Sequence, residues 1–182
     1  AGTAILLEVA RSMSADPPAR SVAFLFVTAE EQGLLGSNWF VHEPPLALEQ
    51  VRAVLNIDGG APPAPPTSWG IVGADASAAG ALARQVVESH GWRADHVAFG
   101  PQSDHWPFHL AGVPALMLFP RTTFEGMSSE AATDLNERWL SPHTPADEWH
   151  PDFPFAGLLR YAELALEIGR ALAGDDFRPA DQ

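Results

Sequence analysis

Acidic side chains follow two apolar segments that are predicted to be strands. Glu30 and Glu31 come directly after Ser21–Thr28, and Asp58 follows Val51–Ile57. Ligands of open α/β sheets bind beyond the carboxyl ends of the strands, so the three acids are expected at a binding edge. Of two adjacent carboxylates, one can ligate a metal while its neighbour takes a proton from metal-bound water. The alternative is an ordinary pair of solvated loop acids.

Two histidine-containing segments could complete such a site. His143 lies between two prolines, so its backbone is stiff and its imidazole can be held at a fixed angle for a metal. Taken alone, it would more often be an ordinary loop histidine. Ser103, Asp104 and His105 begin a predicted short helix near the mouth of the same sheet. The alternative there is a capping Ser or Asp with a packed histidine.

The composition limits the chemistry that these residues can do. The chain has 182 residues, no cysteine and a formal net charge of −13. Without thiolates, a zinc ion must be held by histidines and carboxylates. The negative charge, with no lysine in the sequence, argues against a nucleic-acid partner. A serine hydrolase is not supported either, because the chain has no Gly-x-Ser-x-Gly motif.

The chain alternates between predicted strands and helices, as one α/β domain over residues 1–182 requires. The run Ser21–Thr28 is predicted to be a central parallel strand buried on both faces. Further strands are predicted at Val51–Ile57, Trp69–Val72 and Pro114–Phe119, and helices at Ala1–Met13, Leu34–Val41, Ala78–His90, Asp104–Ala111 and Phe155–Leu172. Thr122–Pro142 is predicted to be a long loop. No apolar run approaches the roughly 20 residues needed to cross a bilayer.

Four segments occur in an informative order. They are Thr28-Ala29-Glu30-Glu31-Gln32-Gly33-Leu34-Leu35-Gly36-Ser37, Asn56-Ile57-Asp58-Gly59, Ser103-Asp104-His105 with Pro107-Phe108 and Gly112-Val113-Pro114, and His143-Thr144-Pro145-Ala146-Asp147. Together they closely resemble the co-catalytic two-zinc aminopeptidase family, which includes bacterial leucyl aminopeptidases and glutamate carboxypeptidase and glutaminyl cyclase branches. The resemblance implies a three-layer α/β/α zinc-peptidase fold with a mostly parallel, mixed central sheet.

The resemblance also implies roles for the matching residues. It implies that Glu30 is the general base, that Glu31 and His143 bind one zinc ion, and that Asp58 binds the other. Asp104 and His105 are expected to bind substrate or to support the metal ligands. The implied activity is that of a zinc-dependent exopeptidase acting on peptides with a free N-terminus, since an acidic site favours an α-ammonium group.

The family pattern has further ligands that this sequence does not contain. The resemblance implies an earlier histidine and a metal-bridging aspartate, the latter about two residues before Ala1. We therefore expect the chain to be the C-terminal part of a peptidase domain, without its N-terminal strands and first two metal ligands. Such a chain should bind zinc at reduced occupancy and expose apolar sheet surface through which it self-associates.

Other functions fit parts of the same pattern. A carboxypeptidase-type member would need cations for the substrate's C-terminal carboxylate, and the nearby loops offer Arg121 and Arg138. A catalytically impaired or non-catalytic module of the same fold would lack metal ligands. Here the candidate base and ligands are all present, namely Glu30, Glu31, Asp58 and His143. The cysteine-free composition is compatible with a secreted, periplasmic or cell-envelope protein.

Overall fold

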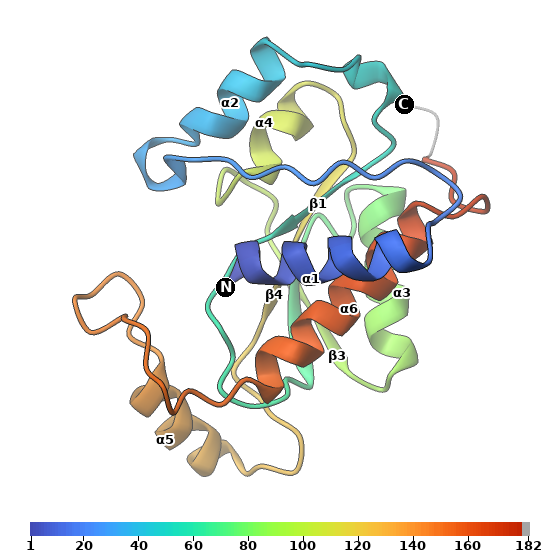
Figure 1. Ribbon diagram of the computed structural model, residues 1–182. Coiled ribbons are helices and arrows are strands. Elements are labelled where there is room, and N and C mark those ends of the chain that lie inside the picture. Colours follow the sequence, from blue (N-terminus) through green and yellow to red (C-terminus); the bar gives the residue numbers. More distant parts are fainter. Residues whose placement is uncertain (180–182) are drawn as a thin grey trace.

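A computed structural model describes residues 1–179 of the chain as a four-stranded sheet with helices on both sides (Figure 1). The strands are β1 (Val54–Ile57), β2 (Ser68–Val72), β3 (Arg93–Val97) and β4 (Ala115–Pro120). The helices are α1 (Gly2–Ala15), α2 (Leu35–His42), α3 (Ala78–Ser89), α4 (His105–Leu110), α5 (Ser129–Trp139) and α6 (Ala156–Leu172), with short 3₁₀ turns at Glu30–Gln32 and Leu48–Gln50. Within residues 1–179, no helix is long and apolar enough to cross a membrane.

The sheet has the order β1-β4-β2-β3. β1 pairs with β4 and β2 with β3 in parallel, whereas β2 and β4 are antiparallel. The larger core cluster joins the sheet to α1, α3 and α6, and a second, smaller cluster joins it to α2 and α4. The predicted three-layer fold with a mixed, mostly parallel sheet is therefore confirmed.

Periodicity explains why α1 and α6 cover one face of the sheet. The buried residues of α1 are Ile5, Val9 and Met13, which are four residues apart and so lie on one side of the helix. α1 packs along α6, where Gly169 lets the two helices approach: a Cβ on it would come within 2.9 Å of the Met13 side chain. An ion pair between Arg170 and Asp16 joins their ends.

The prediction of a buried central strand at Ser21–Thr28 is wrong in this structure. The segment runs across the molecule above α1 without forming a strand (Figure 1), and no β-pairing involves it among the described residues. Phe26 is 49% exposed and Val22 38% exposed, while Phe24 and Leu25 are half-buried. The apolar, β-branched sequence indicated an extended chain correctly, but burial on both faces also requires neighbouring strands.

Two elements were missed because their sequences carry little apolar periodicity. Helix α5 lies within the predicted loop Thr122–Pro142, and the Ser128 hydroxyl caps it by accepting from the Ala131 amide at 3.3 Å. Only Ala132 of this helix is buried. Strand β3 is an edge strand with charged and polar side chains, which protect such edges from further pairing but conceal the strand in the sequence.

Tyr161 links α6 to the end of β1 and to β4. Its side chain is fully buried, and its hydroxyl lies within hydrogen-bonding reach of the backbone carbonyls of Asp58, at 3.2 Å, and Leu118. We expect Tyr161→Phe to lower the free energy of unfolding by about 1–3 kcal/mol, because the carbonyl that accepts the single hydroxyl proton then loses its buried donor. Urea denaturation measures this change. Since phenylalanine retains the ring packed against Trp69 at 5.3 Å, a change below about 0.5 kcal/mol would contradict the role of the hydroxyl.

Candidate metal and catalytic site

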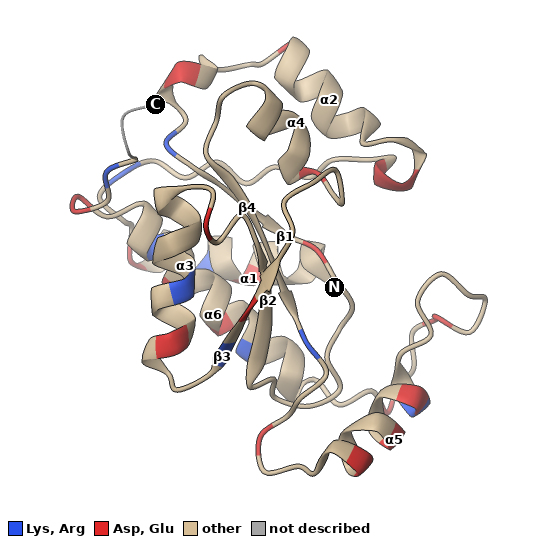
Figure 2. Cartoon of the chain, turned by 180° about the vertical axis from the view of Figure 1, so that it is seen from behind, with Lys and Arg blue, Asp and Glu red and all other residues tan. Residues whose placement is uncertain are grey.

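The turn that carries Glu30 and Glu31 has an unusual backbone. Ala29 and Leu34, on either side of it, have left-handed φ values of 57° and 58°, and Gly33 has φ 100°. Such a conformation costs a non-glycine residue about 1–2 kcal/mol. The Glu30 carbonyl accepts hydrogen bonds from the amides of Gly33, at 3.0 Å, and Leu34, at 2.9 Å, which tie the turn together. The turn is the acidic segment directly before α2 in Figure 2.

Asp58 follows the last residue of β1, and its carboxylate is held in place by hydrogen bonds. The Ser103 hydroxyl donates to Asp58 Oδ2 at 2.6 Å, and the Gly59 amide donates to Oδ1 at 2.7 Å. The Asn56 amide in turn donates to the Ser103 oxygen at 2.8 Å, which directs the serine proton toward Asp58. This chain of bonds fixes the position of the carboxylate.

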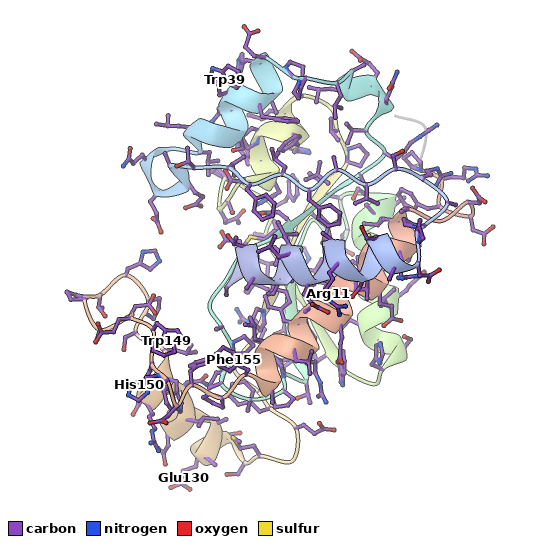
Figure 3. All side chains as sticks on the ribbon, viewed as in Figure 1. Arg11, Trp39, Glu130, Trp149, His150 and Phe155 are labelled. Carbon is purple, nitrogen blue, oxygen red and sulfur yellow. The ribbon has the colours of Figure 1, made fainter. Side chains whose placement is uncertain are left out.

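His143 lies on the loop that follows α5, far from the acids in sequence. Its Nδ1 atom is 3.2 Å from Oε1 of Glu31, and each of the two side chains is 72% exposed. His143 has φ 60°, so its backbone is in the left-handed region, and it follows a proline. Figure 3 shows Trp149 and His150 farther along the same loop, beside α5. The structure thus brings together Glu31 and His143, the two residues to which the resemblance assigned one zinc ion.

The charges of the site affect one another. Burial, followed by the negative charges of Asp58, Glu31 and Asp104, raises the pKa of Glu30, while His143 opposes the rise. A raised pKa makes a carboxylate a better proton acceptor. Burial also raises the pKa of Asp104, which the hydrogen bond from Ser37 partly offsets and the charge of Asp58 reinforces.

His105 lies behind the site rather than in it. Its side chain is fully buried, and neither ring nitrogen has a hydrogen-bond partner of normal geometry. Burial lowers its pKa to about 4, with the Gly100 backbone acting weakly in the opposite direction, so the imidazole is neutral at physiological pH. It packs edge-on to Phe99 with the ring centroids 5.5 Å apart. Of its two predicted roles, only the supporting one is compatible with this burial.

The donor atoms suit zinc, although the described residues do not form a complete binding site. Carboxylate oxygens and an imidazole nitrogen are the ligands that hydrolytic zinc takes, and Glu31 and His143 already lie together. Among residues 1–179, however, no group of three His, Asp or Glu side chains could hold a metal ion. A catalytic zinc ion usually has three protein ligands. The residues therefore fit the metal in type and supply part of its coordination.

Sequence reasoning missed several residues that hold the site in place. Ser37, Ser103 and Asn56 stood inside the matching motifs but received no role of their own, and Tyr161 lay in the predicted last helix without being singled out. Ser37 and Ser103 are fully buried, which the sequence does not reveal because serine is usually exposed. The sequence feature that could have indicated their role is their position inside motifs that contain charged residues.

Comparison with known proteins identifies relatives over most of the chain. The model of peptidase family M28 matches residues 1–168. Aminopeptidase YwaD of Bacillus subtilis (strain 168) is 28% identical over 157 residues, which are 80% of this chain and 31% of that protein. A probable leucine aminopeptidase 2 of Aspergillus oryzae is 35% identical over 136 residues, which are 68% of this chain and 27% of that protein.

Solved structures share the fold. The chain superimposes on BSAP, a zinc aminopeptidase from Bacillus subtilis, with a TM-score of 0.70 and 23% identity, covering 97% of this chain and 42% of that one. The Legionella pneumophila LapA aminopeptidase gives a TM-score of 0.68 and 20% identity, with 95% and 45% covered. The chain thus spans less than a third of the two curated relatives and less than half of these two structures.

Proposed function

Because the chain belongs to peptidase family M28, we propose that it provides catalytic residues of a zinc-dependent aminopeptidase. The observation that carries the proposal is the meeting of acids and an imidazole from distant parts of the sequence. Glu31 lies 3.2 Å from His143, and Glu30 beside it is close enough to Asp58 for their charges to interact. The aminopeptidase names of the two curated relatives support the same function.

Each residue has a distinct part in the proposed reaction. Glu31 and His143 would hold one zinc ion and Asp58 another, and bound zinc would lower the pKa of a water molecule and polarise the scissile carbonyl. Glu30 takes a proton from the attacking water and passes it to the leaving amine. Its raised pKa suits both steps, because the same group must accept the proton and then release it.

The charge of the site favours the amino end of a peptide. Glu30, Asp58 and Asp104 attract an α-ammonium group and repel a carboxylate. The two arginines considered for a carboxypeptidase have other contacts: Arg121 pairs with Asp95 at 3.3 Å, and Arg138 lies over the Trp139 ring. This arrangement favours an aminopeptidase over a carboxypeptidase-type member.

A pair of matched peptides tests the proposal. The longest natural form of the protein, supplied with zinc, should release the first residue of a peptide with a free amine, and a chelator should abolish the release until zinc is restored. The same peptide with an acetylated N-terminus should be cleaved at least about 100-fold more slowly, because it lacks the cation that the acids bind. Equal rates on both peptides would contradict an aminopeptidase, and cleavage that survives the chelator would contradict a zinc enzyme.

A further inference from the structure

The backbone hydrogen bonds of the turn before α2 are local. Amides of the turn and of the start of α2 donate to carbonyls within eight residues, such as Gly36 to Thr28 at 3.0 Å and Leu35 to Ala29 at 3.2 Å. These bonds fold the turn but do not position it on the rest of the domain. In this strained segment, a small displacement of the backbone would move both Glu30 and Glu31.

A buried serine makes a longer-range contact one helical turn farther on. The Ser37 hydroxyl lies 2.5 Å from Oδ1 of Asp104, which is 67 residues away in sequence. It also lies 3.2 Å from the Leu34 carbonyl, the usual local acceptor for a helical serine. A hydroxyl has one proton to donate, and the much shorter contact shows that the bond to the carboxylate dominates.

Asp104 does not have the contacts that its position would suggest. It stands at the N-cap of α4, where an aspartate normally accepts a bond from the helix amides, yet its side chain makes no such bond. Its carboxylate is half-buried and accepts the Ser37 proton instead. Helix capping therefore does not explain the orientation of this side chain.

The contact joins two helices on the same side of the sheet. α2 and α4 lie next to each other (Figure 1), and farther along them the rings of Phe40 and Phe108 pack 5.6 Å apart. The Ser37–Asp104 bond fixes the end of α2 that adjoins the acidic turn, whereas the aromatic pair fixes the opposite end. Asp104, the N-cap of α4, follows Ser103, and Ser103 is bonded to Asp58.

We propose that the hydrogen bond between Ser37 and Asp104 is a positioning contact that sets the location of the Glu30–Glu31 turn relative to Asp58. It connects the turn through α2 and α4 to the serine that holds Asp58. The proposal rests on the proposed function for its catalytic consequence, but its structural part concerns this chain alone. Neither Ser37 nor Asp104 needs to touch the substrate for the contact to act.

Hydrogen exchange tests the structural part without any activity measurement. Ser37→Ala should speed exchange of the Gly33, Leu34 and Gly36 amides by about 10- to 100-fold, as expected for loss of a buried bond to a carboxylate. Ser68→Ala is the matched control, because it also removes a buried serine hydroxyl, here one at the start of β2 that is bonded to Thr123. It should leave exchange in the turn unchanged. Unchanged exchange of these amides in Ser37→Ala would overturn the proposal.

Substitutions at Asp104 distinguish the effect of the hydrogen bond to Ser37 from the effect of the negative charge of Asp104. Asp104→Asn retains an oxygen that accepts from Ser37 and should keep the slow exchange of the turn, whereas Asp104→Ala should lose it. Combined with Ser37→Ala, Asp104→Ala should add little, because both remove one interaction. If Asp104→Asn behaved like Asp104→Ala, the charge rather than the bond would hold the turn and the proposal would be wrong.

Kinetics test the catalytic consequence. Ser37→Ala should lower kcat about 10-fold or more with KM within about 2-fold of its original value, because Glu30 is displaced as a base while the variant keeps every acidic side chain that attracts the ammonium group. An effect on KM alone would overturn the positioning role. A wild-type protein without peptidase activity would contradict the proposed function instead, and the exchange measurements would still decide whether the contact positions the turn.

Discussion

Replacing Glu30 with glutamine lowers the rate of peptide hydrolysis by about 10²- to 10⁴-fold and leaves the zinc content unchanged, as the proposed mechanism requires. Glutamine has nearly the same shape but cannot take the proton from the attacking water. Burial and three neighbouring acids raise the pKa of Glu30, which suits a proton acceptor. Steady-state kinetics and metal analysis of the same dialysed sample measure the two outcomes together.

The same glutamate-to-glutamine substitution at a distant position provides the control for this experiment. Glu49 is exposed and lies in the 3₁₀ turn at Leu48–Gln50, away from the acidic turn. Glu49→Gln should leave both the rate and the metal content within about 2-fold of the original values. A Glu30→Gln protein that loses zinc in proportion to its activity would show that Glu30 is a ligand rather than the base.

Glu31→Gln should have the opposite signature and lose zinc from one position, with activity falling as the metal is lost. Glu31 is the carboxylate that lies 3.2 Å from His143, so the two side chains can bind the same ion. His143→Ala should give the same loss of metal, and the double variant should be no worse than either single one, since both remove ligands of one ion. Isothermal titration of the metal-free proteins with zinc measures the missing binding event.

Which of the two Glu→Gln variants loses zinc decides which glutamate is the ligand and which is the base. Zinc retained by Glu31→Gln but lost by Glu30→Gln would mean that the roles are exchanged. Independent, additive losses in Glu31→Gln and His143→Ala would mean that these residues bind different ions, and their close approach would then be without consequence for metal binding.

Sequence reasoning predicted most of the helices because their apolar residues recur at the helical period. In α6, for example, the buried residues Ala165, Ile168 and Leu172 recur three to four residues apart. It failed for Ser21–Thr28, since an apolar run shows that a segment can be buried but not which strand pairs with it. It also failed for α5, because this helix has only one buried residue and so leaves little pattern to detect.

In the candidate site, too, the sequence motifs identified residues but not the contacts between them. The acids and His143 were recognisable because they stand in motifs, and the structure places Glu31 against His143. The contacts that orient them were not predictable, because a bond such as Ser103 to Asp58 joins positions 45 residues apart. The burial that makes His105 neutral depends on packing against Phe99, which no local pattern contains.

The position of bound zinc tests the central claim most directly. Crystals of the longest natural form, grown with zinc and measured at the zinc absorption edge, show where the metal lies. Our account predicts anomalous density in contact with the side chains of Glu31 and His143, and a second peak at the Asp58 carboxylate that Ser103 holds. Zinc found only elsewhere, for instance between His150 and Asp152, with none at Glu31 and His143, would contradict it.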